Sequence, residues 1–147
     1  MKPLTASLLL LLAAATAAAQ SASPKEGVGK PYAVDYYYKV KWGYQDEFLR
    51  LFKKNRYPVL KKEIEAGRIL RVEVAAPENH MTEDARWDFR VTIVYKNADI
   101  VHAPFDTEAV LKQLYPDRAT FDKEEQRRFE ILLAHWDLPL ASVDLEK

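Results

Sequence analysis

One stretch of alternating side chains, residues 87–95, constrains the fold of this chain more than any other feature. Apolar and aromatic types occupy every second position, namely Trp87, Phe89, Val91, Ile93 and Tyr95. Polar residues stand between most of them, among them Asp88, Arg90 and Thr92. This alternation, rich in β-branched and aromatic residues, predicts a strand with one buried and one polar face. We expect this strand to lie in the middle of a small sheet.

Three further segments have strand character. In residues 32–42, one face would carry Tyr32, Val34, Tyr36, Tyr38, Val40 and Trp42. In residues 69–75, one face would carry Leu70, Val72 and Val74. Residues 135–145 alternate as well, with Trp136, Leu138 and Leu140 on one face. Because Pro139 has no amide donor, this last strand is expected at a sheet edge.

Helical patterns separate the strands. Residues 46–66 carry an apolar stripe, formed by Phe48, Leu49, Phe52, Val59, Leu60 and Ile64. Pro58 cannot donate to the carbonyl of Lys54, so this helix should kink or break near Tyr57. Two shorter helices are expected later, one capped by Asp106 or Thr107 and ending near Tyr115, the other capped by Thr120 or Asp122 and running to about Ala134.

The order of these elements predicts an α+β fold. Helices on one face of an antiparallel sheet cover its apolar side. A split β-α-β arrangement with right-handed crossovers gives the strand order 4-1-3-2. That order places the two longest strands in the centre and the Pro139 strand at an edge. We therefore expect a single ferredoxin-like domain over residues 32–147, preceded by a flexible leader over residues 20–31.

Composition excludes several functional classes. Lys plus Arg equals Asp plus Glu, at 22 each, so no basic excess indicates nucleic-acid binding. The chain has no cysteine, which excludes disulfides and thiolate chemistry. Its four glycines leave no room for a P-loop or a dinucleotide fingerprint.

Reactive and metal-ligating motifs are absent from the sequence. His80 lies in a polar loop whose carboxylates match no standard metal-ligand spacing, so no metal site is predicted. His102 is expected at the surface, and His135 is expected to pair locally. No serine sits in a G-x-S-x-G elbow. Spacing alone therefore nominates no catalytic residue.

Three segments resemble a known family, and they read YYYKVKWGYQDEFLRLF, RYPVLKKEIEAGRIL and WDFRVTIVYKNA. They are similar to the dimeric α/β-barrel (ferredoxin-like) group, which includes antibiotic-biosynthesis monooxygenases, NIPSNAP proteins and EthD-like proteins. The resemblance implies a homodimer whose two sheets pack face to face, and a cavity between each sheet and its helices. Some relatives are oxygenases or haem-degrading enzymes, so haem is a cofactor that the family alone implies. No catalytic residue of those enzymes matches a position here.

A ligand site is predicted where strand aromatics meet the polar break in the helix stripe. Its candidate residues are Tyr36, Tyr38, Asn55, Arg56, Trp87 and Trp136. A polar group in an apolar stripe must find a partner or stay wet, so Asn55 and Arg56 favour a pocket. The alternative is that the aromatic residues form an ordinary core and that Arg56 extends to the surface.

The opposite face of the predicted sheet carries acids and bases in equal number. A dimer interface is predicted there, made of Tyr37, Lys39, Arg71, Glu73, Asp88 and Arg90. Mixed signs suit an isologous contact, in which each patch meets itself across a two-fold axis. The alternative is a face open to water, which antiparallel sheets tolerate.

Three hypotheses for function remain. The first is an exported homodimer that binds a small aromatic or apolar molecule. The second is a cofactor-independent or haem-linked monooxygenase-like enzyme, which rests on the resemblance alone. The third is a structural or protein-interaction module. The residues do not decide whether the chain is an enzyme.

The N-terminus has the pattern of a secretory signal peptide over residues 1–19. Lys2 precedes a short run of leucines, and Ala17 to Ala19 fit a small-residue cleavage site. The leucine run is too short to serve comfortably as a membrane anchor. We expect a periplasmic or secreted protein with no membrane span after the signal is removed.

The export hypothesis predicts that the mature protein begins near Gln20. Mass spectrometry of protein recovered from the cell envelope or the medium should find that N-terminus. Exported material that still carries Met1 would contradict it.

Overall fold

The computed structural model describes residues 29–79 and 81–146. The predicted signal peptide, residues 20–28 of the predicted leader, and His80 lie outside these ranges. Within them, no helix combines the length and the hydropathy needed to cross a bilayer.

The described residues form one antiparallel sheet. Its strands are β1 (Tyr32–Val40), β2 (Ile69–Ala75), β3 (Phe89–Tyr95) and β4 (Leu132–Leu140). They lie in the order β2-β3-β1-β4, which is the predicted order 4-1-3-2 read from the other edge. β4, which contains Pro139, lies at an edge, where a missing amide donor is tolerated. The predicted α+β ferredoxin-like sheet is confirmed.

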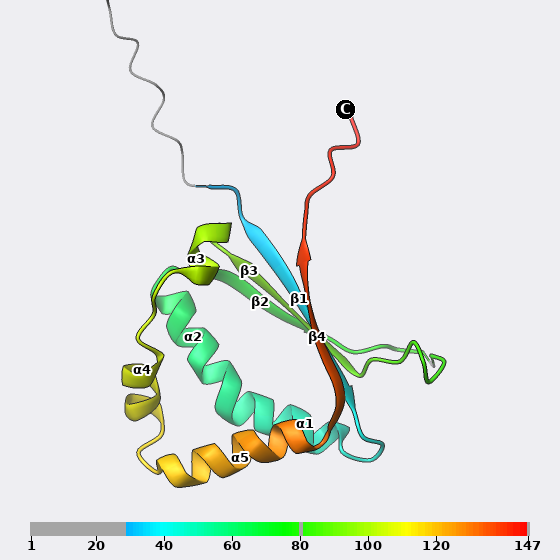
Figure 1. Ribbon diagram of the computed structural model, residues 1–147, viewed down its shortest axis with the longest axis vertical. Coiled ribbons are helices and arrows are strands. Elements are labelled where there is room, and N and C mark those ends of the chain that lie inside the picture. Colours follow the sequence, from blue (N-terminus) through cyan, green and yellow to red (C-terminus); the bar gives the residue numbers. More distant parts are fainter. Residues whose placement is uncertain (1–28, 80, 147) are drawn as a thin grey trace, which may run out of the picture.

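The helices cover one face of this sheet, which we call the inner face, and leave the outer face without a helix (Figure 1). Between β1 and β2 the chain forms α1 (Gln45–Leu51), the π-helical segment η1 (Phe52–Arg56) and α2 (Tyr57–Glu65). Between β3 and β4 it forms α3 (Ala98–His102), α4 (Thr107–Leu114) and α5 (Arg118–Glu130).

The core lies between the inner face and the helices. Phe89, Val91, Ile93 and Tyr95 of β3 are all buried there, as their alternation predicts. Burying each such side chain contributes about 1.5–3 kcal/mol. The regular strand begins at Phe89 rather than at Trp87. The predicted central strand is therefore confirmed from Phe89 onward.

The predicted break near Tyr57 is confirmed as a π-helical turn. The Tyr57 amide donates to the carbonyl of Phe52, five residues back, which is the π-helical spacing. Pro58 has no N–H to offer the Lys54 carbonyl. The Tyr115 hydroxyl, which follows α4, lies 3.1 Å from that oxygen and 2.7 Å from the Asn55 carbonyl, as a donor to both. A side chain sixty residues away thus satisfies a backbone group at the wide turn.

Two strand faces differ from the prediction. In β2 the register shifts between Ile69 and Arg71, so Ile69 enters the core and Leu70 is exposed. The extra residue of this bulge reverses the expected parity at its start. Trp42 was expected on the inner face, but β1 ends at Val40 and the Trp42 side chain is 68% exposed.

The later boundaries also differ. β4 begins at Leu132 and ends at Leu140, three to five residues earlier than expected. α5 begins at Arg118 because the Asp117 carboxylate accepts from the Thr120 amide as the cap, in place of Thr120 or Asp122. The Asp106 cap of α4 is confirmed, since its carboxylate accepts from the Ala109 amide at 2.9 Å.

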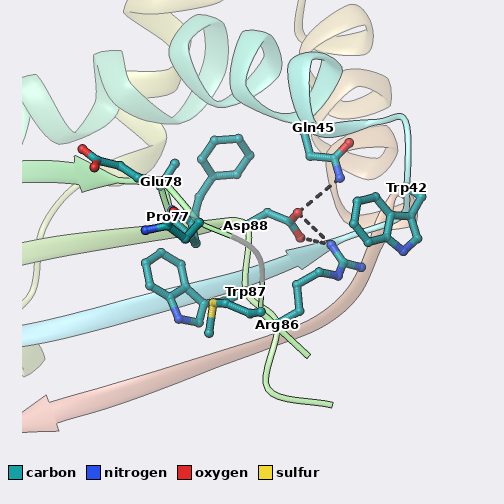
Figure 2. A pocket seen from close by; sticks show the side chains of 11 residues that line it. Trp42, Gln45, Pro77, Glu78, Arg86, Trp87 and Asp88 are labelled. Carbon is teal, nitrogen blue, oxygen red and sulfur yellow. Dashed lines mark hydrogen bonds and ion pairs between the residues drawn. The ribbon is translucent and has the colours of Figure 1, made fainter. Parts of the chain in front are cut away.

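A buried ion pair joins the hairpin loop to the end of β1. The Asp88 carboxylate accepts from Arg86 Nη1, from Gln45 Nε2 and from the Val40 amide. Figure 2 shows this carboxylate between Gln45 and Arg86, with the Trp42 ring beside the guanidinium. Arg86 Nη2 also donates to the Val40 carbonyl at 3.0 Å. We call this set the Arg86–Asp88 staple.

The staple corrects part of the predicted dimer interface. Asp88 was expected to project from the outer face, but its carboxylate is engaged inside the protomer. Lys39 is engaged too, since its ammonium contacts the carboxylate and the carbonyl of Glu83 in the hairpin loop. Both side chains have intramolecular partners because the loop folds back over the end of the sheet.

The Arg86–Asp88 staple predicts that replacement of the polar residue Asp88 has a large effect on the stability of the protein. Asp88→Ala should lower the free energy of unfolding by about 3 kcal/mol, because Arg86 then remains buried without its main partner. Urea denaturation of the purified protein measures this change. Glu73→Ala is the control, because its pair with Arg71 is exposed on both sides and should contribute less than about 1 kcal/mol. Equal losses for the two variants would contradict the role given to Asp88.

Candidate functional site

A cavity of about 320 Å³ lies between the inner face and the helices. Strands β1, β3 and β4 supply its floor, while η1, α2 and α5 supply its walls. It is lined by Tyr36, Tyr38, Phe52, Arg56, Leu60, Val91, Ile93, Glu125, Arg128, Phe129 and His135. Its volume is at the lower end of the range for small-molecule sites, which is about 300–1,000 Å³.

Three of the six predicted ligand-site residues line this cavity. They are Tyr36, Tyr38 and Arg56. The two tyrosines are on the inner face by strand parity, and Arg56 is the last residue of the π-helical turn. The sequence therefore identified the strand and the helix that meet at the cavity.

Tyr36 and Tyr38 line the cavity, and Tyr95 lies behind Tyr36. Burial raises the pKa of Tyr38, and burial together with the hydrogen bond to Tyr36 raises the pKa of Tyr95. The hydroxyls of Tyr36 and Tyr95 lie 3.0 Å apart. Tyr38 is only 6% exposed, and its hydroxyl has no hydrogen-bond partner among the described residues. The Tyr38 oxygen is not one of the buried unpaired atoms of the described residues, so this free hydroxyl is open to solvent at the cavity, where a ligand can bond to it.

Arg128 brings a buried cation to the cavity wall. The residue is 3% exposed, and its guanidinium donates from Nε at 3.0 Å and from Nη2 at 2.7 Å to the Glu125 carboxylate. It also lies 4.5 Å from the centre of the Phe129 ring. A buried charge of this kind requires a partner, and the two-point contact with Glu125 supplies it.

His135 is a lining residue that the sequence did not nominate. Its ring stacks on Tyr38 with centroids 4.4 Å apart. Nδ1 lies 2.9 Å from the Tyr37 carbonyl and Nε2 lies 3.1 Å from the Asp137 carboxylate, so it pairs locally as expected. The face of the sheet on which His135 lies is linked to that of Trp136 by the alternation along β4, because the two neighbours must point to opposite faces.

The predicted orientation of Trp136 and Trp87 is wrong. Trp136 pairs with Tyr37 across β1 and β4, and directly paired residues share a face, so both lie on the outer face. Their rings stack with centroids 5.3 Å apart. Trp87 precedes β3 and meets the Tyr37 ring edge-on at 5.5 Å. The prediction assigned both tryptophans to the inner face from strand parity, whereas these rings bury one another on the outer face.

Asn55 is buried, as the stripe predicts, but it does not line the cavity. Its Nδ2 donates to Glu124 at 3.1 Å and so joins η1 to α5. Its carbonyl accepts the Tyr115 hydroxyl. Asn55 therefore holds the π-helical turn against its neighbours, while the next residue, Arg56, reaches the cavity.

Two other hollows are weaker candidates. The one drawn in Figure 2, of about 350 Å³, is lined by Trp42, Trp87 and the Arg86–Asp88 staple. Its buried polar groups already bond one another. An apolar groove beside β2 includes Val72, Val74 and Tyr57, and it offers hardly any polar group to orient a ligand.

The lining residues offer haem iron no free histidine ligand. Iron needs a free imidazole nitrogen or a comparable ligand. Both nitrogens of His135 already face protein acceptors, and exposed His102 lies on α3, outside the cavity lining. In the described part of the chain, no group of three or more His, Cys, Asp and Glu side chains could hold a metal ion.

Comparisons with known proteins support the fold. No protein-family model matches the sequence, and no curated protein matches it. A NIPSNAP family protein from Agrobacterium tumefaciens aligns with a TM-score of 0.50 and 12% identity, over 80% of this chain and 90% of that one. A dimeric ferredoxin-like protein from an uncultured marine organism aligns with a TM-score of 0.50 and 7% identity, over 78% and 90%.

A third solved structure is a cofactor-independent oxygenase from Streptomyces nogalater, with a TM-score of 0.46 and 11% identity over 80% of this chain and 98% of that one. At these identities the similarity concerns the fold. The resemblance predicted from the sequence is confirmed at that level: the chain has the ferredoxin-like fold that NIPSNAP and dimeric ferredoxin-like proteins share.

Proposed function

We propose that this chain is an exported, homodimeric protein that binds a small molecule in the cavity between its sheet and its helices. The observation that carries the proposal is the Tyr38 hydroxyl, which lies at this cavity and has no hydrogen-bond partner among the described residues. Most of the lining is apolar or aromatic, with a few polar groups that converge on the space. That composition is typical of ligand sites.

The dimer proposal concerns the outer face. Beside the stacked pair of Tyr37 and Trp136, the β4 residues Leu138 and Leu140 are 45% and 44% exposed. An apolar row on an uncovered sheet suggests an interaction surface. Tyr37, Arg71, Glu73 and Arg90 remain from the predicted interface, and their charges of both signs lie on β3 and β2, toward the other edge of the same face. A second copy of the same face would meet each sign with its opposite.

The relative from the uncultured marine organism is described as dimeric, which favours a second copy as the partner. Export remains a proposal as well. It rests on the pattern of residues 1–19.

Ligand binding predicts saturable stabilisation by small aromatic compounds. At a hundred times its Kd, such a compound should add about 2.7 kcal/mol to the free energy of unfolding. Thermal unfolding against a panel of one-ring and two-ring compounds, both neutral and charged, measures this. His135→Trp should abolish the effect by filling the rim of the cavity. His102→Trp, the same exchange on exposed α3, should leave the effect intact. A panel without any stabilising compound would refute the binding proposal.

The dimer predicts twice the mature mass in light scattering at micromolar concentration. Leu138→Lys should raise the dimer dissociation constant by about tenfold or more, because it places an unpaired charge in the contact. Leu145→Lys is the matched control, since Leu145 is 89% exposed in the C-terminal segment. A monomer at all accessible concentrations would exclude the dimer and return the outer face to solvent.

A further inference from the structure

The cavity lining contains one positive charge without a partner. Arg56 and Arg128 contribute two guanidinium groups, while Glu125 contributes the one carboxylate of the lining. Glu125 is occupied by Arg128 through two hydrogen bonds. Arg56 has neither an ion pair nor a hydrogen bond among the described residues. It is half-buried, so water screens it less than it would a surface arginine.

This charge acts on the phenol groups of the cavity. Arg56 and Arg128 each oppose the effect of burial on the pKa of Tyr38, and Arg56 does the same at Tyr95. Both guanidinium groups therefore lie within electrostatic reach of the unpartnered Tyr38 hydroxyl. A positive group and a free O–H donor on the same cavity form a donor pair for an oxyanion.

The remaining lining sets the shape of the molecule that fits. Phe129 offers exposed apolar surface, and the buried side chains of Phe52, Leu60, Val91 and Ile93 close the cavity behind it without any group that can form a hydrogen bond. An inorganic anion would leave this surface without contacts. A cation would meet the unbalanced positive charge of Arg56, because Glu125 already pairs with Arg128. An organic anion with an apolar body matches both halves of the cavity.

We infer that the cavity selects small aromatic or aliphatic carboxylates, with the carboxylate on Arg56 and the Tyr38 hydroxyl and the apolar body against β3, α2 and Phe129. This inference rests on the proposed ligand-binding function and names its ligand class. Hydrogen bonds that involve a charged group strengthen binding by about 10-fold to 100-fold over a site that lacks them.

The test compares two probes of the same shape by isothermal titration calorimetry on the mature full-length protein. 2-Naphthoate carries the carboxylate, and 2-naphthamide is its neutral counterpart. Naphthoate should bind about tenfold or more tightly than naphthamide. Arg56→Gln should weaken naphthoate by about tenfold and leave naphthamide nearly unchanged. Tyr38→Phe keeps the ring and should weaken naphthoate about threefold to tenfold through loss of one hydroxyl.

Lys112→Gln provides the control, because it removes the same charge from an exposed position on α4, outside the cavity lining. It should change neither affinity. Equal binding of the two probes, unaffected by Arg56→Gln, would overturn the selection of anions while leaving the binding function intact. If neither probe nor any compound of the thermal panel bound, the proposed function itself would fail. A naphthoate preference that Lys112→Gln removed as fully as Arg56→Gln would show a general charge effect and also overturn the inference.

Discussion

The amide that Pro58 lacks is the constraint on which the helical layer depends. Without that donor the α-helical hydrogen bond to the Lys54 carbonyl is missing, and the helix widens into the π-helical turn η1 before α geometry resumes in α2. The turn requires outside partners, and the chain supplies them from the later segment between β3 and β4, through Tyr115 and through Glu124. That segment therefore has a structural role, which is to hold η1. With η1 fixed, Arg56 is directed to the cavity.

The sheet contributes the other half of the site through parity. Side chains alternate between faces, so Tyr36, Tyr38 and His135 share the inner face while Tyr37 and Trp136 share the outer one. Because of this alternation, the paired strands β1 and β4 present two different surfaces. The inner surface is enclosed by helices and carries the cavity. The outer surface is uncovered and carries stacked rings, leucines and mixed charges.

Sequence periodicity predicted the sheet order and the central strand. When apolar residues occupy every second position over many residues, one arrangement buries the apolar face of the strand. The prediction from periodicity failed where a single residue shifts the alternation of side chains between the two faces. The bulge at Leu70 reverses the parity at the start of β2, and Trp136 was assigned to the inner face, although the β1–β4 register pairs it with Tyr37 on the outer face. The Arg86–Asp88 staple was invisible, since nothing local shows that a hairpin loop folds back onto β1. His135 was missed because Trp136 was assigned to the inner face, and the alternation of β4 then places His135 on the opposite face.

Three local departures from ordinary packing coincide at the inner cavity. A π-helical turn interrupts a helix, a buried phenol lacks a partner, and a half-buried guanidinium lacks a counter-ion. Apolar residues at Tyr38 and Arg56 would satisfy the rules of core packing more completely. The π-helical turn and Arg56 belong to one segment, whereas Tyr38 comes from β1, so two separate parts of the chain contribute these features. Departures of this kind concentrate at functional sites, because binding needs groups that the fold itself leaves unsatisfied. The staple forms the opposite case, since its buried charges saturate one another and leave nothing for a ligand.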